Sequence, residues 1–256
     1  MFKKTFIFIL LLILVFGGIV QAGEIQVNIN QNDEDEKISE ERDYNFNYDK
    51  KSFNGFKANG GPVLSLIQLD INELNENIKN QNFSPFSSEM ILFGGKGIFG
   101  SKKGSSFGFN GMEGRLSSVS NANTYYRKAV LKMNYGGMLY EKGLYLNSKT
   151  NTDVAFSSFI GGGNMNLDLY YEKTAANFES QIAQANSNHF TKDFFLLAPG
   201  ISINQKISSF VGLNMSLKYL LSYDFGESWK TQGQILTGPM RNFHSPMLNI
   251  QMSFGF

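Results

Sequence analysis

Residues 247–256 of the chain read MLNIQMSFGF, and apolar and polar residues alternate there without a break. Successive side chains of a β-strand point to opposite faces, so this stretch predicts a strand with one apolar and one polar face. In a soluble protein, such a strand at a sheet edge would promote aggregation. A closed barrel has no edge and lipid would cover its apolar face, so the stretch favours a membrane barrel.

The composition of the 256 residues supports a β-protein and excludes several functions. The 26 glycines disfavour helices, because a glycine in a helix costs about 1 kcal/mol relative to alanine. The formal net charge is +1, so no overall basic field points to nucleic acid. The chain has no cysteine, which excludes disulfides, thiol chemistry and zinc–thiolate sites.

The amino terminus has the features of a secretory signal peptide. Two lysines precede an apolar stretch at residues 5–20, and Ala22 ends a small-residue cleavage pattern. We predict a signal peptide over residues 1–22, with an uncleaved membrane anchor as the alternative. No later stretch approaches the length and apolar character of a transmembrane helix.

An acidic segment follows the predicted signal peptide. Residues 32–43, NDEDEKISEERD, hold seven acids and two bases. Such a segment buries little apolar surface, so we predict a disordered periplasmic arm over residues 23–56. The four consecutive acids at 33–36 lack the central glycine of a calcium-binding loop, and no metal site is predicted there.

Residues 57–256 form the predicted barrel. Eight strand-like runs, rich in glycine and aromatic residues, alternate there with polar connections. The runs cover residues 57–69, 87–99, 104–115, 127–147, 152–171, 192–205, 208–221 and 245–256. Apolar residues occupy every second position between 211 and 221 and between 129 and 135, as they do in the last run.

Connection lengths separate a membrane barrel from a soluble sandwich, which shows the same alternation. The connections are short at 101–104, 148–151 and around Lys206, and long at 70–86, 116–126, 172–191 and 222–244. Short periplasmic turns and long extracellular loops are typical of outer-membrane barrels. We therefore predict an all-β, transmembrane, antiparallel up-and-down β-barrel of eight strands, with ten strands or a soluble sandwich as alternatives.

Aromatic residues near the predicted strand ends support this orientation. Those beside the long loops are Tyr125, Tyr126, Tyr170, Tyr171, Phe194, Phe195 and Tyr223, and those at the opposite rim are Phe99, Tyr145, Phe254 and Phe256. Two aromatic girdles are typical of a barrel in lipid.

Two stretches fit the alternation poorly. The apolar parity changes between Phe156 and Met165, which predicts a β-bulge within residues 161–163. Pro199 has no backbone N–H to donate, so we expect a second bulge there.

Residues 194–220, FFLLAPGISINQKISSFVGLNMSLKYL, resemble a segment of an uncharacterised family of small bacterial outer-membrane β-barrels. GGPVLSL near residue 60, FGGKGIFG at 93–100 and NYGGMLYE at 134–141 are similar to the glycine-rich strands of that family, so the resemblance covers most of residues 57–221. An acid often precedes the Pro-Gly pair in the family, whereas this chain has Ala198. The resemblance implies the fold and no established activity. A terminal strand ending in Phe256 also resembles the signal read by the outer-membrane assembly machinery.

Few residues suggest chemistry. The G-x-G-x-x-G pattern at 95–100 is followed by a turn into another strand, whereas a dinucleotide site needs a helix there. His189 and His244 are the two histidines, and we expect both to be solvated in or beside outer loops. A lipid-modifying enzyme that uses them as bases is the third functional hypothesis. We therefore assign no catalytic, cofactor-binding or metal-binding residue.

Charged residues on polar strand faces are expected to pair inside the lumen, because an eight-stranded barrel is just wide enough for side chains. These residues are Lys132, Lys218, Asp168 and Glu113. Trp229 lies in the longest connection and is expected to be exposed, in contact with a partner or with lipid head groups.

The sequence therefore predicts a non-enzymatic β-barrel in the bacterial outer membrane, with a structural or surface-interaction role through its long extracellular loops. A narrow porin-like barrel that transports small solutes is the main alternative. The expected partners are outer-membrane lipid and, through Phe256, the assembly machinery. Neither a nucleic acid nor a cofactor is expected.

Overall fold

A computed structural model of the chain describes residues 56–255, apart from 102–103, 123–124, 148–149, 174–185 and 225–228. The predicted signal peptide, the acidic arm up to residue 55 and Phe256 lie outside the described residues. The described elements are β1 (Phe56–Gln68), α2 (Asn72–Asn80), β2 (Glu89–Ser101), β3 (Ser105–Ala122), β4 (Tyr125–Asn147), β5 (Thr152–Lys173), β6 (Asn186–Lys206), β7 (Val211–Tyr223), β8 (Trp229–Thr231), β9 (Gln234–Leu236) and β10 (His244–Gly255).

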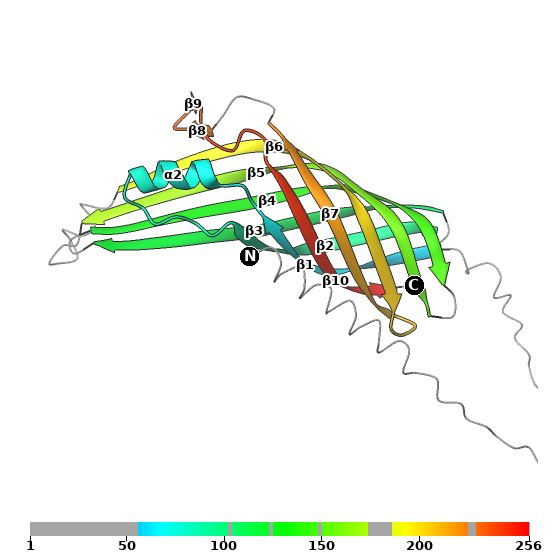
Figure 1. The fold of residues 1–256 in the computed structure, drawn as a ribbon. Coiled ribbons are helices and arrows are strands. Elements are labelled where there is room, and N and C mark those ends of the chain that lie inside the picture. Colours follow the sequence, from blue (N-terminus) through cyan, green and yellow to red (C-terminus); the bar gives the residue numbers. More distant parts are fainter. Residues whose placement is uncertain are drawn as a thin grey trace, which may run out of the picture. The chain divides into compact units, whose positions relative to one another are not determined.

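Eight of these strands form a closed antiparallel barrel (Figure 1). Around the ring the order is β1-β2-β3-β4-β5-β6-β7-β10, and β10 closes it by pairing with β1, for example Ile250 with Leu64. All eight predicted strands are confirmed. The three-residue strands β8 and β9 pair with each other, and β8 pairs with β6, so they lie outside the ring.

The last strand has the two faces that its sequence predicts. Asn249 and Gln251 are buried inside the barrel, whereas Met252 and Phe254 are exposed on its outer surface. β7 repeats this arrangement, with Asn214 and Ser216 buried and Leu217 exposed. The outer surface therefore carries an apolar belt, built from these strands and from exposed residues of their neighbours such as Phe93 and Phe109.

The two ends of the barrel differ. At one end, here called the short-turn end, brief connections join β2 to β3, β4 to β5 and β6 to β7. At the other, called the α2 end, the chain forms α2 between β1 and β2, and β8 and β9 between β7 and β10. The predicted long loop at 116–126 is wrong, because β3 continues to Ala122 and β4 begins at Tyr125. The small polar residues there pair across the two strands, for example Ser118 with Ala129.

Four neighbouring strands are much longer than the others. β3, β4, β5 and β6 have 18, 23, 22 and 21 residues, whereas β1, β2 and β7 have 13 each and β10 has 12. Their extra length lies at the α2 end, and the green and yellow strands in Figure 1 run past the end of β1 there. We call this part the projecting sheet: residues 113–122, 125–134, 164–173 and 186–193.

A row of paired glycines marks where the projecting sheet begins. Gly95 pairs with Gly111, Gly111 with Gly136, and Gly136 with Gly162. We call this row the glycine band. On its short-turn side β4 buries Glu141 and exposes Met138, whereas on its other side β4 buries Met133 and half-exposes the Lys132 side chain. On the short-turn side, polar residues thus face the interior and apolar residues face outward, and on the other side the reverse holds. Along each strand, the same alternate positions continue to face the interior.

Neither of the two predicted bulges is present, so both predictions are wrong. The ladder between β4 and β5 runs without a register shift through residues 161–163, and its irregularity lies between Gly143 and Tyr145 instead. The apolar parity changes in β5 because its surroundings change, not because the strand turns over. At Pro199 the ladder with β7 is interrupted between Leu197 and Gly200 and resumes in the same register, so no bulge forms there.

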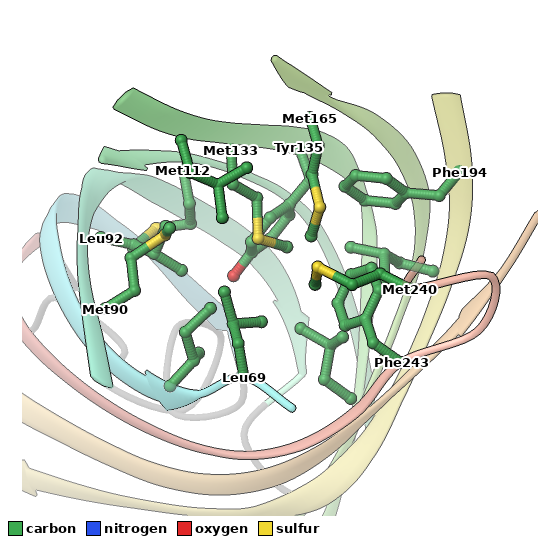
Figure 2. Packing of buried hydrophobic residues seen from close by; sticks show 14 of the residues in the cluster. Leu69, Met90, Leu92, Met112, Met133, Tyr135, Met165, Phe194, Met240 and Phe243 are labelled. Atoms are coloured by element: carbon green, nitrogen blue, oxygen red, sulfur yellow. The ribbon is translucent and has the colours of Figure 1, made fainter. Parts of the chain in front are cut away.

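Buried hydrophobic side chains fill the interior at the α2 end (Figure 2), and six of those in the described residues are methionines: Met90, Met112, Met133, Met165, Met240 and Met247. The Tyr135 hydroxyl donates to the Met247 sulfur at 3.2 Å. Leu74 and Ile78 of α2 belong to the same cluster, so the helix closes this end of the core. Methionine is flexible and fills the irregular gaps that such a closure leaves.

Candidate functional site

The interior on the short-turn side of the glycine band holds a buried ion cluster. Glu141 accepts hydrogen bonds from Lys57 at 3.1 Å and from Lys96 at 2.7 Å. Lys57 also lies 3.8 Å from an oxygen of Asp153. Lys218 is buried in the same interior, as predicted, but among the described residues it forms no ion pair, so the predicted pairing fails for it. Buried charges require such pairing, because their desolvation is costly.

Side chains fill the barrel on both sides of the glycine band. Polar side chains of the interior contact one another and the backbone. Asn249 donates to the hydroxyl of its ladder partner Ser216 at 2.9 Å, and Gln251 donates to the Lys96 carbonyl at 3.1 Å. The methionine-rich core occupies the α2 end. The interior is therefore packed, as expected for a ring of eight strands.

The other three charged residues that we expected in the lumen lie on the outer surface, so that prediction is wrong for them. Glu113, Lys132 and Asp168 all belong to the projecting sheet, where the polar face points outward. Sequence alternation correctly groups residues of one strand but does not say which face is inside. The structure brings Lys132 and Asp168 together and leaves Lys218 on the other side of the wall.

A groove on the outer face of the projecting sheet collects charged and aromatic side chains. Its volume is about 330 Å³, and its lining residues are Arg115, Tyr126, Lys128, Val130, Lys132, Asp168, Tyr170 and Glu172. They come from three adjacent strands, β3, β4 and β5. We call this feature the outer groove.

Asp168 is the centre of a polar network at the outer groove. One carboxylate oxygen lies 3.1 Å from Lys132 Nζ, and the other lies 2.6 Å from Nδ1 of His189 on β6. Asp168 lies on the projecting sheet, beyond the apolar belt. Partial burial alone would raise the pKa of Asp168, but the hydrogen bonds from His189 and Lys132 hold that pKa below its ordinary value. The network therefore keeps Asp168 ionised.

Two cations face each other at the same groove. Arg115 of β3 stands directly opposite Lys132 of β4 in the ladder. Like charges at directly opposed positions destabilise a sheet, and Asp168 compensates only through Lys132. This arrangement favours an anionic group above the pair.

The two histidines lie on different parts of the outer surface. His189 contacts Asp168 in a geometry that would orient a general base, but among the described residues no serine or threonine hydroxyl is hydrogen-bonded to it. His244, at the start of β10, stacks on Tyr219 with ring centroids 6.5 Å apart. The structure thus does not bring the histidines together. In the described ranges, no group of three or more His, Asp or Glu side chains could hold a metal ion.

Trp229 is buried, and the prediction that it is exposed is wrong. Only 4% of its surface is accessible, and its indole N–H donates to the Pro239 carbonyl at 2.9 Å. It lines an apolar pocket of about 290 Å³ together with Ile78 of α2 and Phe190 of β6. The chain around Trp229 was predicted to be a loop, and the short β8–β9 hairpin that folds it inward has no strong signal in the sequence.

The aromatic residues follow the predicted girdle at the short-turn end, whereas at the α2 end only some of them do, such as the exposed Tyr223. Phe99, Tyr145 and Phe254 are exposed there, as expected. At the α2 end, Phe194 is buried in the core, and Tyr125 stacks on Tyr171 at the far end of the projecting sheet. The sequence did not indicate that four strands extend beyond the rest. The aromatic rim at the α2 end was therefore predicted at the wrong position along the barrel axis.

The fold defines an eight-stranded antiparallel up-and-down β-barrel with a packed interior, an apolar outer belt and a polar extension of four strands. Within the described ranges, no helix has the length and hydrophobicity to cross a bilayer. No protein-family model and no curated protein matches the chain, so the resemblance to an uncharacterised barrel family stays a prediction.

Three solved structures of outer-membrane β-barrel proteins are similar in strand arrangement. Ail, the attachment invasion locus protein of Yersinia pestis, solved in complex with the heparin analogue sucrose octasulfate, has 11% identity and a TM-score of 0.38 over 78% of this chain and 98% of its own. Neisserial surface protein A has 9% identity and a TM-score of 0.30 over 78% and 97%. The outer membrane protease OmpT from Escherichia coli has 6% identity and a TM-score of 0.23 over 79% and 96%. These scores are low, so the fold assignment rests on the strand pairing of this chain.

Proposed function

We propose that the protein is a non-enzymatic barrel of the bacterial outer membrane that interacts with other molecules through its projecting sheet. The apolar belt supports the membrane location, because exposed residues such as Phe93, Phe109 and Leu217 would be costly in water. The short-turn end then faces the periplasm and the α2 end faces the outside. In this orientation the polar outer face of the projecting sheet lies beyond the lipid.

The proposed surface interaction is based on the outer groove. It combines flat aromatic surfaces, Tyr126 and Tyr170, with an excess of positive charge. Three cations, of which Arg115 and Lys132 face each other, line it against the two carboxylates of Asp168 and Glu172. Aromatic rings suit the apolar faces of sugars, and paired cations suit acidic substituents. We therefore propose acidic polysaccharide as the class of partner.

The filled interior supports this role over the alternative of solute transport. Glu141 and its two lysines occupy one half of the lumen, and the methionine-rich core with Leu74 and Ile78 of α2 occupies the other. An open pathway would require both parts to move. The enzyme hypothesis has the His189–Asp168 contact in its favour, but no serine or threonine hydroxyl is hydrogen-bonded to that pair within the described ranges.

Binding of dextran sulfate to whole cells that display the protein tests the proposed interaction. Replacing Arg115, Lys128 and Lys132 together by glutamine should weaken binding about ten-fold, since three exposed charge contacts of about 0.5 kcal/mol each give that factor. Lys142→Gln, on the same strand but at the short-turn end, is the matched control and should bind like the parent. Equal binding by the triple variant, or equal binding of uncharged dextran, would exclude this groove as the site.

A further inference from the structure

Lys218 is an unpaired charge inside the barrel. It is 3% exposed, and within the described residues its ammonium group makes no hydrogen bond and no ion pair. Both oxygens of Glu141, the nearest acid that acts on it electrostatically, already bind Lys57 and Lys96. A buried ammonium group without a counter-charge is strongly unfavourable, so the charged form of Lys218 requires an anionic partner.

A glycine on the neighbouring strand lets the Lys218 side chain lie across the barrel wall. In the ladders, Lys218 of β7 pairs with Gly200 of β6, and Gly200 pairs with Ser157 of β5. All three positions face the interior. A Cβ atom at Gly200 would lie 2.7 Å from Cγ of Lys218, so only glycine lets the lysine stem lie across this position. The row thus brings the ammonium group toward the Ser157 side chain.

Ser157 is a second buried donor without a partner. Its hydroxyl is inaccessible to solvent and makes no hydrogen bond. Glu141 follows Ser157 in the same cross-strand row, but its two oxygens are held by lysines. This part of the interior therefore holds three lysines, Lys57, Lys96 and Lys218, and two carboxylates, Glu141 and Asp153. The excess positive charge lies in the row that also holds the Ser157 hydroxyl.

We propose that Lys218, Gly200 and Ser157 form a buried binding site for a small inorganic anion such as chloride or phosphate. The Lys218 ammonium group and the Ser157 hydroxyl both donate to the anion, which balances the excess charge of the ion cluster. The site lies inside the barrel, on the other side of the wall from the outer groove, and does not depend on the proposed surface interaction.

The melting temperature of the purified barrel in detergent, measured in chloride, phosphate or gluconate at equal ionic strength, tests this site. Gluconate is much bulkier than chloride or phosphate and serves as the anion that the proposed site should not accept. The parent protein should melt a few degrees higher in chloride or phosphate, since an anion that binds only the folded state stabilises it. Response to chloride alone or phosphate alone would identify which anion the site accepts.

Two variants and one control test whether the anion effect on melting temperature arises at Lys218 and Ser157. Lys218→Met should abolish the anion response, and Ser157→Ala, which removes a single hydroxyl, should shift the response to higher anion concentrations. Lys142→Met, an exposed position on β4, should keep the full response. Equal melting of the parent in all three salts, or an unchanged anion response in Lys218→Met or, where that variant does not fold, in Ser157→Ala, would overturn the proposal.

Discussion

Replacing Glu141 by glutamine is expected to lower the stability of the barrel by about 3–5 kcal/mol, because it leaves two buried lysines without their shared carboxylate. Lys57 and Lys96 both donate to Glu141, and both are almost fully buried. For a protein of this size, the loss corresponds to a fall of about 6–20 °C in melting temperature. The temperature at which the folded band disappears on an unboiled gel measures it.

Glu113→Gln is the matched control for this substitution. Glu113 is a carboxylate on the outer face of β3, exposed to solvent, so its replacement should change stability by no more than about 0.5 kcal/mol. Adding Lys96→Met to the Glu141→Gln variant should restore part of the lost stability, since one uncompensated charge is then removed. If Glu141→Gln and Glu113→Gln melt together, the ion cluster does not stabilise the barrel.

Replacing Gly137 by alanine should prevent normal pairing of β4 with β5. An added Cβ would lie 2.3 Å from the Ile160 carbonyl oxygen and 2.5 Å from the Gly161 Cα, and both are backbone atoms that cannot rotate away. Forcing extra atoms into a packed site costs about 1–3 kcal/mol or more. We expect a lower melting temperature and a reduced yield of folded barrel, measured on unboiled gels.

The adjacent glycine provides an unusually close control. At Gly136, on the same strand, the nearest atom to an added Cβ is the Asn110 carbonyl oxygen at 3.7 Å, which is ordinary contact. Gly136→Ala should therefore fold like the parent. Equal behaviour of the two alanine variants would contradict the close approach of β5 to β4 at Gly137.

The alternation of residues predicted the barrel well because it depends on a property local to each strand. Every strand from β1 to β10 in the ring contains one of the predicted runs, and the faces of β7 and β10 are as expected. Alternation does not tell whether the inward face is the polar or the apolar one, and this changes at the glycine band. Lys132 and Asp168 were therefore placed in the lumen, although they lie outside it.

Elements that depend on distant contacts were missed. α2 is held by its buried residues Leu74 and Ile78, which pack on the barrel core, and its polar sequence reads as a loop. Trp229 is drawn inward by the same core. The outer groove needs cross-strand register to bring Arg115 opposite Lys132, and single-strand patterns do not give that register.

The proposed membrane location requires the apolar belt to be in contact with lipid. Fractionation of cells that express the protein, followed by electrophoresis of boiled and unboiled samples, tests this directly. We predict that the protein is found in the outer-membrane fraction and that its mobility changes on heating, because a closed ladder of strands resists detergent until it is heated. Recovery in the soluble fraction without detergent would contradict the membrane location and the orientation on which the proposed interaction rests.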